Sequence, residues 1–295
     1  MQLFMQQVLL GVSLGAIYAL LALSFTTIFQ GTKVFNLSQG TVMLAGVFAA
    51  AKVAPHLGFW VSAVVGLIVG TALAVVIWAL TLASRGSDHL TQTIMTLGVQ
   101  VVLLSELTRR IGSDFLSMGD PWGASVWHIG GVGIPEARMW AIVATSVLIG
   151  GFFWVFRATP WGAAMRAASS DPITAELVGI SERKVAAVAW AIGGSLAVVA
   201  GTFLAAAPSP GLDYTSHLVA LSAIPAVVIG GLDSSLGAVV GGLLVGLVQV
   251  LVTGYSSYYT FLGSDIGNVT PYILMVVVLL VKPHGLFGSK EIARV

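Results

Sequence analysis

Long apolar runs repeat along the whole 295-residue chain, and its first 32 residues contain no charged side chain. Overall, 57% of the residues are apolar and 8% are charged, with a mean hydropathy of +0.97. Soluble domains carry about 25% charged residues, so this chain has too few charges to cover a water-soluble fold. Disordered chains are polar and highly charged, so disorder is excluded as well. We therefore expect an all-α, polytopic transmembrane helical bundle, since each helical crossing needs about 20 apolar residues.

The charged and reactive residues exclude several classes of function. Thirteen Lys and Arg residues nearly balance twelve Asp and Glu residues, so no basic surface for binding nucleic acid is expected. The expected partner of the apolar surface is the lipid bilayer. The chain has no cysteine, which excludes disulfides, thiolate metal sites and cysteine nucleophiles. Its five histidines are scattered without metal-ligand spacing, so no metal site is predicted. No Gly-Lys dipeptide is present, so we expect no phosphate-binding loop.

Nine apolar runs predict about 8–9 membrane segments, including short or broken ones. No basic residue precedes Val8–Phe29, so we expect a retained first segment and not a cleaved signal. Thr41–Ala51 is shorter than an ordinary crossing, and Leu218–Gly231 is broken by Pro225. Whether these two runs cross fully or re-enter is left open by the sequence. The other runs are Gly58–Leu82, Leu90–Leu107, Met139–Phe156, Val185–Ala207, Leu236–Gly254 and Val269–Val281.

The basic residues predict an orientation. The polar stretch Arg109–Arg138 is expected to be a loop outside the membrane, and Arg157–Lys184 is the most charged segment. Basic residues concentrate in cytoplasmic loops. If each segment crosses once and Arg157–Lys184 is cytoplasmic, that side holds nine basic residues against four. The nine are Lys33, Arg85, Arg157, Arg166, Arg183, Lys184, Lys282, Lys290 and Arg294. This predicts an external N-terminus and a cytoplasmic C-terminus.

Four pairs of glycines have the G-x-x-x-G spacing, which lets helix backbones approach closely in a membrane. They are Gly11/Gly15, Gly66/Gly70, Gly237/Gly241 and Gly242/Gly246. Because the chain has 35 glycines, such pairs also arise by chance, and we expect ordinary helix packing. Ionisable residues inside the runs are rare. Glu106, with Arg109 and Arg110 three and four residues later, predicts an ion pair at the membrane boundary and not a proton relay.

The segment Arg157–Lys184 predicts two short helices at the membrane surface. The first covers Trp161–Ser170. Asp171-Pro172 then supplies an N-cap and a first helical residue for a second helix over Ile173–Val178, which Gly179 ends. Helices this short are marginal alone. This favours a docking element for a cytoplasmic protein over a surface connector without a partner.

Residues 157–180, R-A-T-P-W-G-A-A-M-R-A-A-S-S-D-P-I-T-A-E-L-V-G-I, resemble the coupling loop of the high-affinity branched-chain amino acid ABC transporter permeases. Three further blocks agree in order and spacing: F-N-L-S-Q-G at 35–40, the glycine-rich block at 226–242 and K-P-H-G-L-F-G at 282–288. The resemblance covers about residues 8–290, and the length is similar to that of the shorter of the two permease subunits. Ser38-Gln39 stands where relatives usually carry Ala-His, a departure that bears on the substrate and not on the fold.

The resemblance implies a single permease domain over residues 1–295 in the cell inner (plasma) membrane. The implied partners are a second homologous permease subunit, two cytoplasmic ATP-binding cassette subunits and an extracytoplasmic substrate-binding protein. ATP and Mg would sit on the partners, so no cofactor and no enzymatic activity are expected in this chain. The implied substrates are branched-chain or hydrophobic amino acids, or a related solute such as urea, an amide or an aromatic acid. The alternative is a stand-alone secondary transporter or channel for a small neutral solute.

Two sets of site residues are predicted. In the family, the loop at 157–184 docks onto the ATPases, and the coupling candidates are Gly162, Arg166, Ala167, Asp171, Ala175, Glu176 and Gly179. The short segments are expected to line the translocation route, because Pro225 leaves a carbonyl without its helical donor and such breaks are tolerated beside a cavity. The route candidates are Asn36, Ser38, Gln39, Thr41, Ser222, Pro225 and Ala226. A packing kink with a polar surface loop is the alternative.

Overall fold

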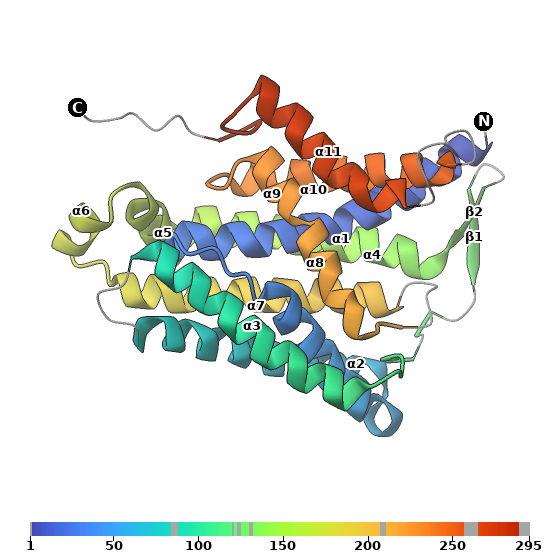
Figure 1. The fold of residues 1–295 in the computed structure, drawn as a ribbon, viewed down its shortest axis with the longest axis horizontal. Coiled ribbons are helices and arrows are strands. Elements are labelled where there is room, and N and C mark those ends of the chain that lie inside the picture. The colour runs from blue at the N-terminus through green and yellow to red at the C-terminus, as the bar shows by residue number, and fades with distance from the viewer. Residues whose placement is uncertain are drawn as a thin grey trace.

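The computed structural model describes residues 2–83, 88–119, 121–122, 125–129, 132–206, 211–256 and 265–288. Its long helices lie side by side along one axis (Figure 1). Six of them are long and apolar enough to cross a membrane: α1 (Gln2–Thr32), α2 (Gln39–Ala83), α3 (His89–Ile111), α4 (Glu136–Ala158), α7 (Glu182–Ala206) and α10 (Ser235–Gly254). The shorter helices are α5 (Pro160–Ser170), α6 (Pro172–Leu177), the 3-10 turn η1 (Tyr214–His217), α8 (Leu218–Ser222), α9 (Ile224–Gly230) and α11 (Ile266–Val281).

Helix α2 consists of two membrane segments joined by a kink. Gly58 has φ +72° and ψ 173°, a conformation that favours glycine. The parts on either side, 39–57 and 59–83, run back along each other, because a Cβ on Gly66 would stand 2.6 Å from the Gly46 carbonyl oxygen. The second segment is therefore longer than the predicted Thr41–Ala51. The helix continues through Lys52, whose ammonium group lies 5.5 Å from the centre of the Phe48 ring.

With α2 counted as two segments and η1–α9 as one broken segment, the described part of the chain has nine membrane segments. This agrees with the predicted bundle of 8–9 segments. One element was not predicted. An antiparallel hairpin of β1 (Val126–Ile129) and β2 (Val132–Pro135) lies in the loop before α4.

Both short segments lie on stretches of chain that run between opposite ends of the bundle, as expected for segments that cross (Figure 1). Residues 33–38 turn back from the end of α1, and α2 begins where the Gln39 side chain reaches Ser24, about 12 Å inside that end. The segment η1–α9 starts after Leu212, which pairs through its backbone with Leu116 in the loop after α3. It ends at the α9–α10 turn, at the other end of the molecule (Figure 1).

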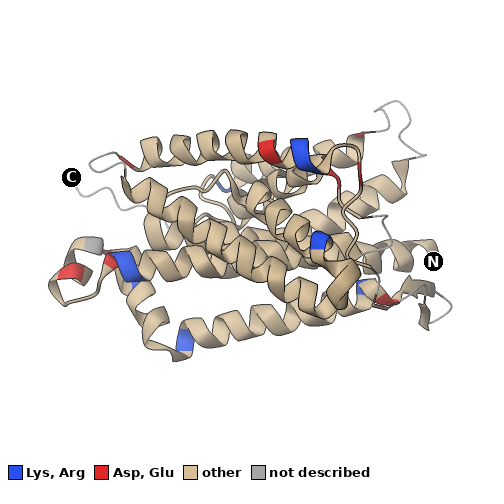
Figure 2. Ribbon diagram, turned by 90° about the horizontal axis from the view of Figure 1, so that it is seen from below, with Lys and Arg blue, Asp and Glu red and all other residues tan. Residues whose placement is uncertain are grey.

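Charged residues lie mainly toward the two ends of the bundle, with few between them (Figure 2). One end carries α5, α6, the α9–α10 turn and the loop after α11 (Figure 1). Six described basic residues belong to segments at this end: Lys33, Arg157, Arg166, Arg183, Lys184 and Lys282. Four belong to segments toward the opposite end: Lys52, Arg109, Arg110 and Arg138. Arg85, Lys290 and Arg294 lie outside the described residues. Glu106 bridges Arg109 at 2.8 Å and Arg110 at 2.5 Å, as predicted.

Glycine contacts hold the central helices together. A Cβ on Gly242 or Gly246 of α10 would collide with the backbone of α1 at Ala19 or Gly15. The other predicted pairs also pack inside the chain: Gly11 against Leu247, Gly66 against the first part of α2, Gly70 against Val198 of α7, and Gly237/Gly241 against α9. All four pairs therefore serve intramolecular helix packing, as expected.

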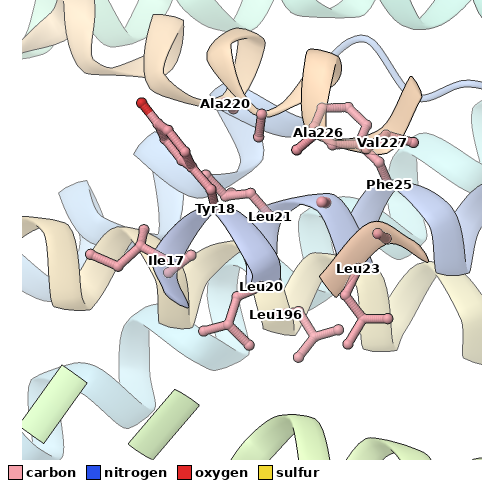
Figure 3. Packing of buried hydrophobic residues seen from close by; sticks show 14 of the residues in the cluster. Ile17, Tyr18, Leu20, Leu21, Leu23, Phe25, Leu196, Ala220, Ala226 and Val227 are labelled. Carbon is pink, nitrogen blue, oxygen red and sulfur yellow. The ribbon is translucent and has the colours of Figure 1, made fainter. Parts of the chain in front are cut away.

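The main apolar cluster forms around the buried middle of α1. Figure 3 shows Ile17, Leu20, Leu21, Leu23 and Phe25 of α1 packed with Leu196 of α7 and with Ala220, Ala226 and Val227 of the broken segment. In the same view the hydroxyl oxygen of Tyr18 points away from Leu20 and Leu196. The broken segment is thus part of the packed interior on one side.

Candidate functional sites: a surface helix pair and two broken membrane segments

The surface helix pair, defined as α5 and α6 with their turns (residues 159–181), is built by local capping. Asp171 caps α6, accepting a hydrogen bond of 3.1 Å from the backbone N–H of Thr174 and one of 2.7 Å from its hydroxyl. The helix ends at Gly179, which has φ +87°. There the Ile180 N–H donates to the Ala175 carbonyl at 3.0 Å, as in a Schellman motif. The predicted start and stop of α6 are confirmed.

Gly162 and Arg166 attach α5 to the end of α4. A Cβ on Gly162 would collide with the Phe156 carbonyl, so only glycine permits this approach. The Arg166 guanidinium donates to the same carbonyl and lies 5.3 Å from the Phe156 ring centre. The Thr159 hydroxyl caps α5, accepting from the Gly162 N–H at 3.3 Å. Arg166 was predicted as a polar contact for a partner. It is exposed, but its guanidinium already binds within the chain.

The two alanines predicted for coupling face the interior of the surface helix pair. Ala175 is buried in a small apolar cluster with Met165, Val185 and Ala189, and Ala167 packs against this cluster. A larger side chain at either position would therefore act by displacing α6 from α5 and α7.

The outer face of α6 presents large apolar side chains that sequence reasoning did not single out. The exposed fractions of Ile173, Leu177 and Val178 are 76%, 82% and 71%. Glu176 is exposed beside them. This apolar trio lies at the tip of a charged loop, where an apolar surface indicates a protein or membrane contact. The spacing i, i+4, i+5 was a usable signal for an apolar helix face.

The start of α2 holds a fully buried polar network made by four predicted route residues. The Asn36 side-chain amide donates to Gln39 Oε1 at 2.7 Å, and Asn36 Oδ1 accepts from the Ser38 hydroxyl at 2.6 Å. Gln39 Nε2 donates to the Gly193 carbonyl of α7 at 2.9 Å. The Thr41 hydroxyl donates to the Ser38 carbonyl at 2.7 Å. In this conformation these side chains satisfy one another and α7 and have no exposed surface.

Two threonines of α3 accept hydrogen bonds from backbone N–H groups of the non-helical segment before α2. The Thr93 hydroxyl accepts from the Phe35 N–H at 3.2 Å, and the Thr96 hydroxyl accepts from the Leu37 N–H at 3.0 Å. Unpaired backbone groups at membrane depth cost several kcal/mol, so these hydroxyls allow residues 33–38 to leave the helical form there. Sequence reasoning missed them, although T-Q-T-I-M-T at 91–96 was visible.

Three predicted route residues lie at the break between α8 and α9, and they differ in burial. Pro225 and Ala226 are buried, and Ser222 is half-buried. A Cβ on Gly241 of α10 would collide with the Ala226 carbonyl, so α9 is fixed closely on α10. The predicted segments meet beside this break, because a Cβ on Gly40 would stand 3.2 Å from the Ala220 Cβ of α8.

A polar trio of Tyr18, Gln249 and the predicted Ser222 lies at the same break, and sequence reasoning missed its first two members. The Tyr18 hydroxyl of α1 donates to Gln249 Oε1 of α10 at 2.8 Å and also contacts the Ser222 side chain. Polar side chains at this depth are costly unless they pair or face water. Tyr18 and Gln249 are therefore further candidate route residues beside Ser222.

Comparison with known proteins identifies the family. A sequence profile described as the permease component of branched-chain amino acid transport systems matches residues 7–280. The chain belongs to this family. It is therefore a multi-pass membrane permease, and the resemblance seen in the four sequence blocks is confirmed.

Relatives agree over nearly full length. The high-affinity branched-chain amino acid transport system permease protein LivH of Salmonella typhimurium is 28% identical over 99% of this chain and 98% of its own. The probable branched-chain amino acid transport permease protein LivH of Methanocaldococcus jannaschii is 29% identical, covering 91% and 88%. The ribose import permease protein RbsC of Haemophilus influenzae is 24% identical, covering 95% and 84%. A solved structure, PsaBC from Streptococcus pneumoniae in complex with Fab, shares the fold with a TM-score of 0.53 at 13% identity, covering 95% of this chain and 92% of its own.

Proposed function

We propose that this chain is the transmembrane permease subunit of an ABC importer for branched-chain or other hydrophobic amino acids, driven by partner ATPases. The family and the LivH relatives support the amino acid substrate. Because a ribose permease also matches at lower identity, the substrate needs its own measurement.

The single observation that carries the proposal is the apolar trio on α6. Ile173, Leu177 and Val178 are exposed on or beside a six-residue helix whose Ala175 is buried against its neighbours. Burying a large apolar side chain contributes about 1.5–3 kcal/mol, so a partner covering the trio gains a substantial docking energy. We assign this contact to the ATPase, with Glu176 at its edge.

The proposed orientation follows from the same element. If the surface helix pair is cytoplasmic, the described basic residues divide six to four in favour of that side. The loop after α11 lies at the same end, so the C-terminus is proposed to be cytoplasmic (Figure 1). The second permease subunit, the two ATPases and the extracytoplasmic binding protein are proposed partners.

The proposed mechanism moves the two broken segments. In this conformation the network around Asn36 and Gln39 is closed, and α9 is fixed on α10. ATP binding by the partners would displace the surface helix pair, and rocking of the helices would open the route between Gln39 and Ser222. Neutral side chains suit the passage of a zwitterion without trapping it.

Co-purification and uptake test the proposal together. The chain is expressed with its ATPases and binding protein, and the triple variant Ile173→Ser, Leu177→Ser, Val178→Ser is compared with Phe115→Ser. Phe115 is exposed at the opposite end and serves as the matched control. We expect the triple variant to reach the membrane, lose the ATPases and lose leucine uptake. Leucine transport by the chain without ATPases would instead identify a stand-alone transporter.

A further inference from the structure

A cavity of about 780 Å³ opens at the end of the molecule that carries the surface helix pair, and no function is yet attached to it. It lies among the last turn of α1, the end of α5, the α9–α10 turn and the loop after α11. Its volume is within the range of about 300–1,000 Å³ that is usual for small-molecule sites.

The walls of this cavity distinguish it from others in the described residues. Cavities of about 410, 420 and 470 Å³ lie between helices and have almost wholly apolar walls, as expected for grooves that face lipid. The 780 Å³ cavity instead includes Lys33, Asp233 and His284 together with the Ser169 and Ser170 side chains. Its position and its polarity both suit a water-soluble ligand.

Opposite charges come from two different elements. Lys33 follows α1, and Asp233 lies in the α9–α10 turn. Lys33 has φ +56°, and it is the one non-glycine residue with a positive φ in the described ranges. This conformation costs of the order of 1–3 kcal/mol and is typical of functional positions. Its N–H donates to the Phe29 carbonyl at 2.7 Å, and its ammonium group lies 5.7 Å from the Phe29 ring centre.

The same cavity also has apolar walls. They are formed by Phe29 of α1, Val228 of α9, Leu232 of the turn and Leu279 of α11. A cation, a carboxylate and an apolar surface in one cavity are complementary to the carboxylate, the ammonium group and the side chain of an apolar amino acid.

We infer that this cavity binds a free zwitterionic amino acid with an apolar side chain, with its carboxylate at Lys33 and its ammonium group at Asp233. The inference rests on the proposed function for its substrate class, because the ligand would be the imported amino acid on the cytoplasmic side.

Binding there opposes transport. The ligand would bridge α1 to the α9–α10 turn and thereby stabilise the conformation in which α9 is fixed on α10. A ligand that binds one conformation lowers the population of the other by a factor of 1 + [L]/Kd. Internal amino acid at ten times its Kd would therefore slow uptake about tenfold. The cavity thus makes import sensitive to the amount already inside.

Direct binding is measured first, so that the cavity is tested apart from transport. The purified chain in detergent, without the binding protein, is dialysed against radiolabelled leucine. We expect saturable binding that Lys33→Met and Asp233→Asn each weaken at least tenfold and that Lys282→Met leaves unchanged. Lys282 is an exposed lysine at the same end that does not line the cavity. Absence of saturable binding, or binding insensitive to both cavity variants, overturns the inference.

Transport is then measured with the complete transporter in proteoliposomes that contain ATP. For each variant, the readout is the ratio of uptake rates with and without leucine trapped inside. The wild-type and Lys282→Met ratios should fall about tenfold at saturating internal leucine, whereas the Lys33→Met and Asp233→Asn ratios should stay near one. Trapped leucinol lacks the carboxylate and 4-methylpentanoate lacks the ammonium group, so each should inhibit at least tenfold less.

The two proposals fail in different ways. Leucine binding in the cavity without any ATP-driven leucine uptake contradicts the proposed function but not the binding site. Uptake with an unchanged ratio at high internal leucine contradicts regulation by the site. Equal inhibition by 4-methylpentanoate contradicts a zwitterion site. Loss of the co-purified ATPases in the Lys33→Met and Asp233→Asn variants indicates a protein contact in the cavity and also overturns the inference.

Discussion

The side chain of Gln30 joins the end of α1 to the α9–α10 turn, because its Nε2 donates a hydrogen bond of 2.7 Å to the backbone carbonyl of Asp233. Its Oε1 accepts a second one, of 3.2 Å, from the Ser235 hydroxyl. The next residue, Gly31, packs on α7, where an added Cβ would stand 2.6 Å from the Ala189 Cβ. Since Ala189 belongs to the cluster that holds α5 and α6, one turn of α1 connects the surface helix pair to the broken segment.

Replacing Gln30 with Ala should uncouple ATP hydrolysis from transport. The variant loses two hydrogen bonds worth about 1 kcal/mol each, so the link weakens by about 2 kcal/mol. We expect uptake per ATP hydrolysed to fall about tenfold, with the ATPases still bound, since a tenfold change corresponds to about 1.4 kcal/mol. The measurement is uptake and hydrolysis in the same proteoliposomes, with Gln2→Ala on the exposed start of α1 as the control. An unchanged ratio would show that the link carries no motion.

Replacing Gly242 with Val should destabilise the bundle strongly. A Cβ there would collide with the α1 backbone at Ala19, and overpacking of this kind costs about 1–3 kcal/mol or more. Gly150→Ala on α4 is the matched control, because no atom lies within 4 Å of its added Cβ. Thermal unfolding in detergent should show a lower Tm for Gly242→Val and an equal or higher Tm for Gly150→Ala. Equal stability of the two variants would contradict the close α1–α10 contact.

Much of the fold follows from local signals in the sequence. Apolar run lengths predict the bundle, and the caps of α6 at Asp171 and Gly179 lie where single residue types require them. The boundary between two segments near Gly58 was predicted, but its tight kink and the β1–β2 hairpin were not. Glycine can adopt the positive φ of Gly58, but the sequence does not reveal whether it does so. The hairpin lies in a segment whose polarity predicted only a loop.

The sites were less predictable because their contacts come from distant parts of the chain. The polarity of Asn36 and Gln39 marked a special segment, but its closure depends on Thr96 and Gly193, which lie far along the sequence. Arg166 was expected to face a partner, yet its position is set by the Phe156 carbonyl. For α6, the spacing of its large residues indicates an apolar face, but the burial of Ala175 against α5 and α7 depends on the tertiary fold.

Replacing Thr96 with Val should destabilise the extended segment before α2. The change leaves the Leu37 N–H without its hydroxyl partner at membrane depth, and an unsatisfied group costs about 1–3 kcal/mol. Thr93→Val should have a similar effect through Phe35. Thr253→Val is the control, because that exposed hydroxyl donates to the Gln249 carbonyl of its own helix. Hydrogen exchange of residues 33–41 should rise in the α3 variants alone, and unchanged protection would contradict the assigned role of these hydroxyls.

Cysteine substitutions at four route positions should report the opening of the closed segments. The chain has no native cysteine, so each introduced thiol is observed alone. Ser222→Cys should react with a small water-soluble thiol reagent at rest, because Ser222 is half-buried at the break. Asn36→Cys, Gln39→Cys and Ala226→Cys should react at least about tenfold more slowly at rest, since these positions have no exposed surface, and faster during ATP turnover. Val102→Cys is the control for a surface that meets lipid, because Val102 is exposed on a membrane helix and should not react in either state. If the labelling rates at positions 36, 39 and 226 do not change with ATP turnover, a static packing kink is favoured. Both segments would then be excluded from the translocation route.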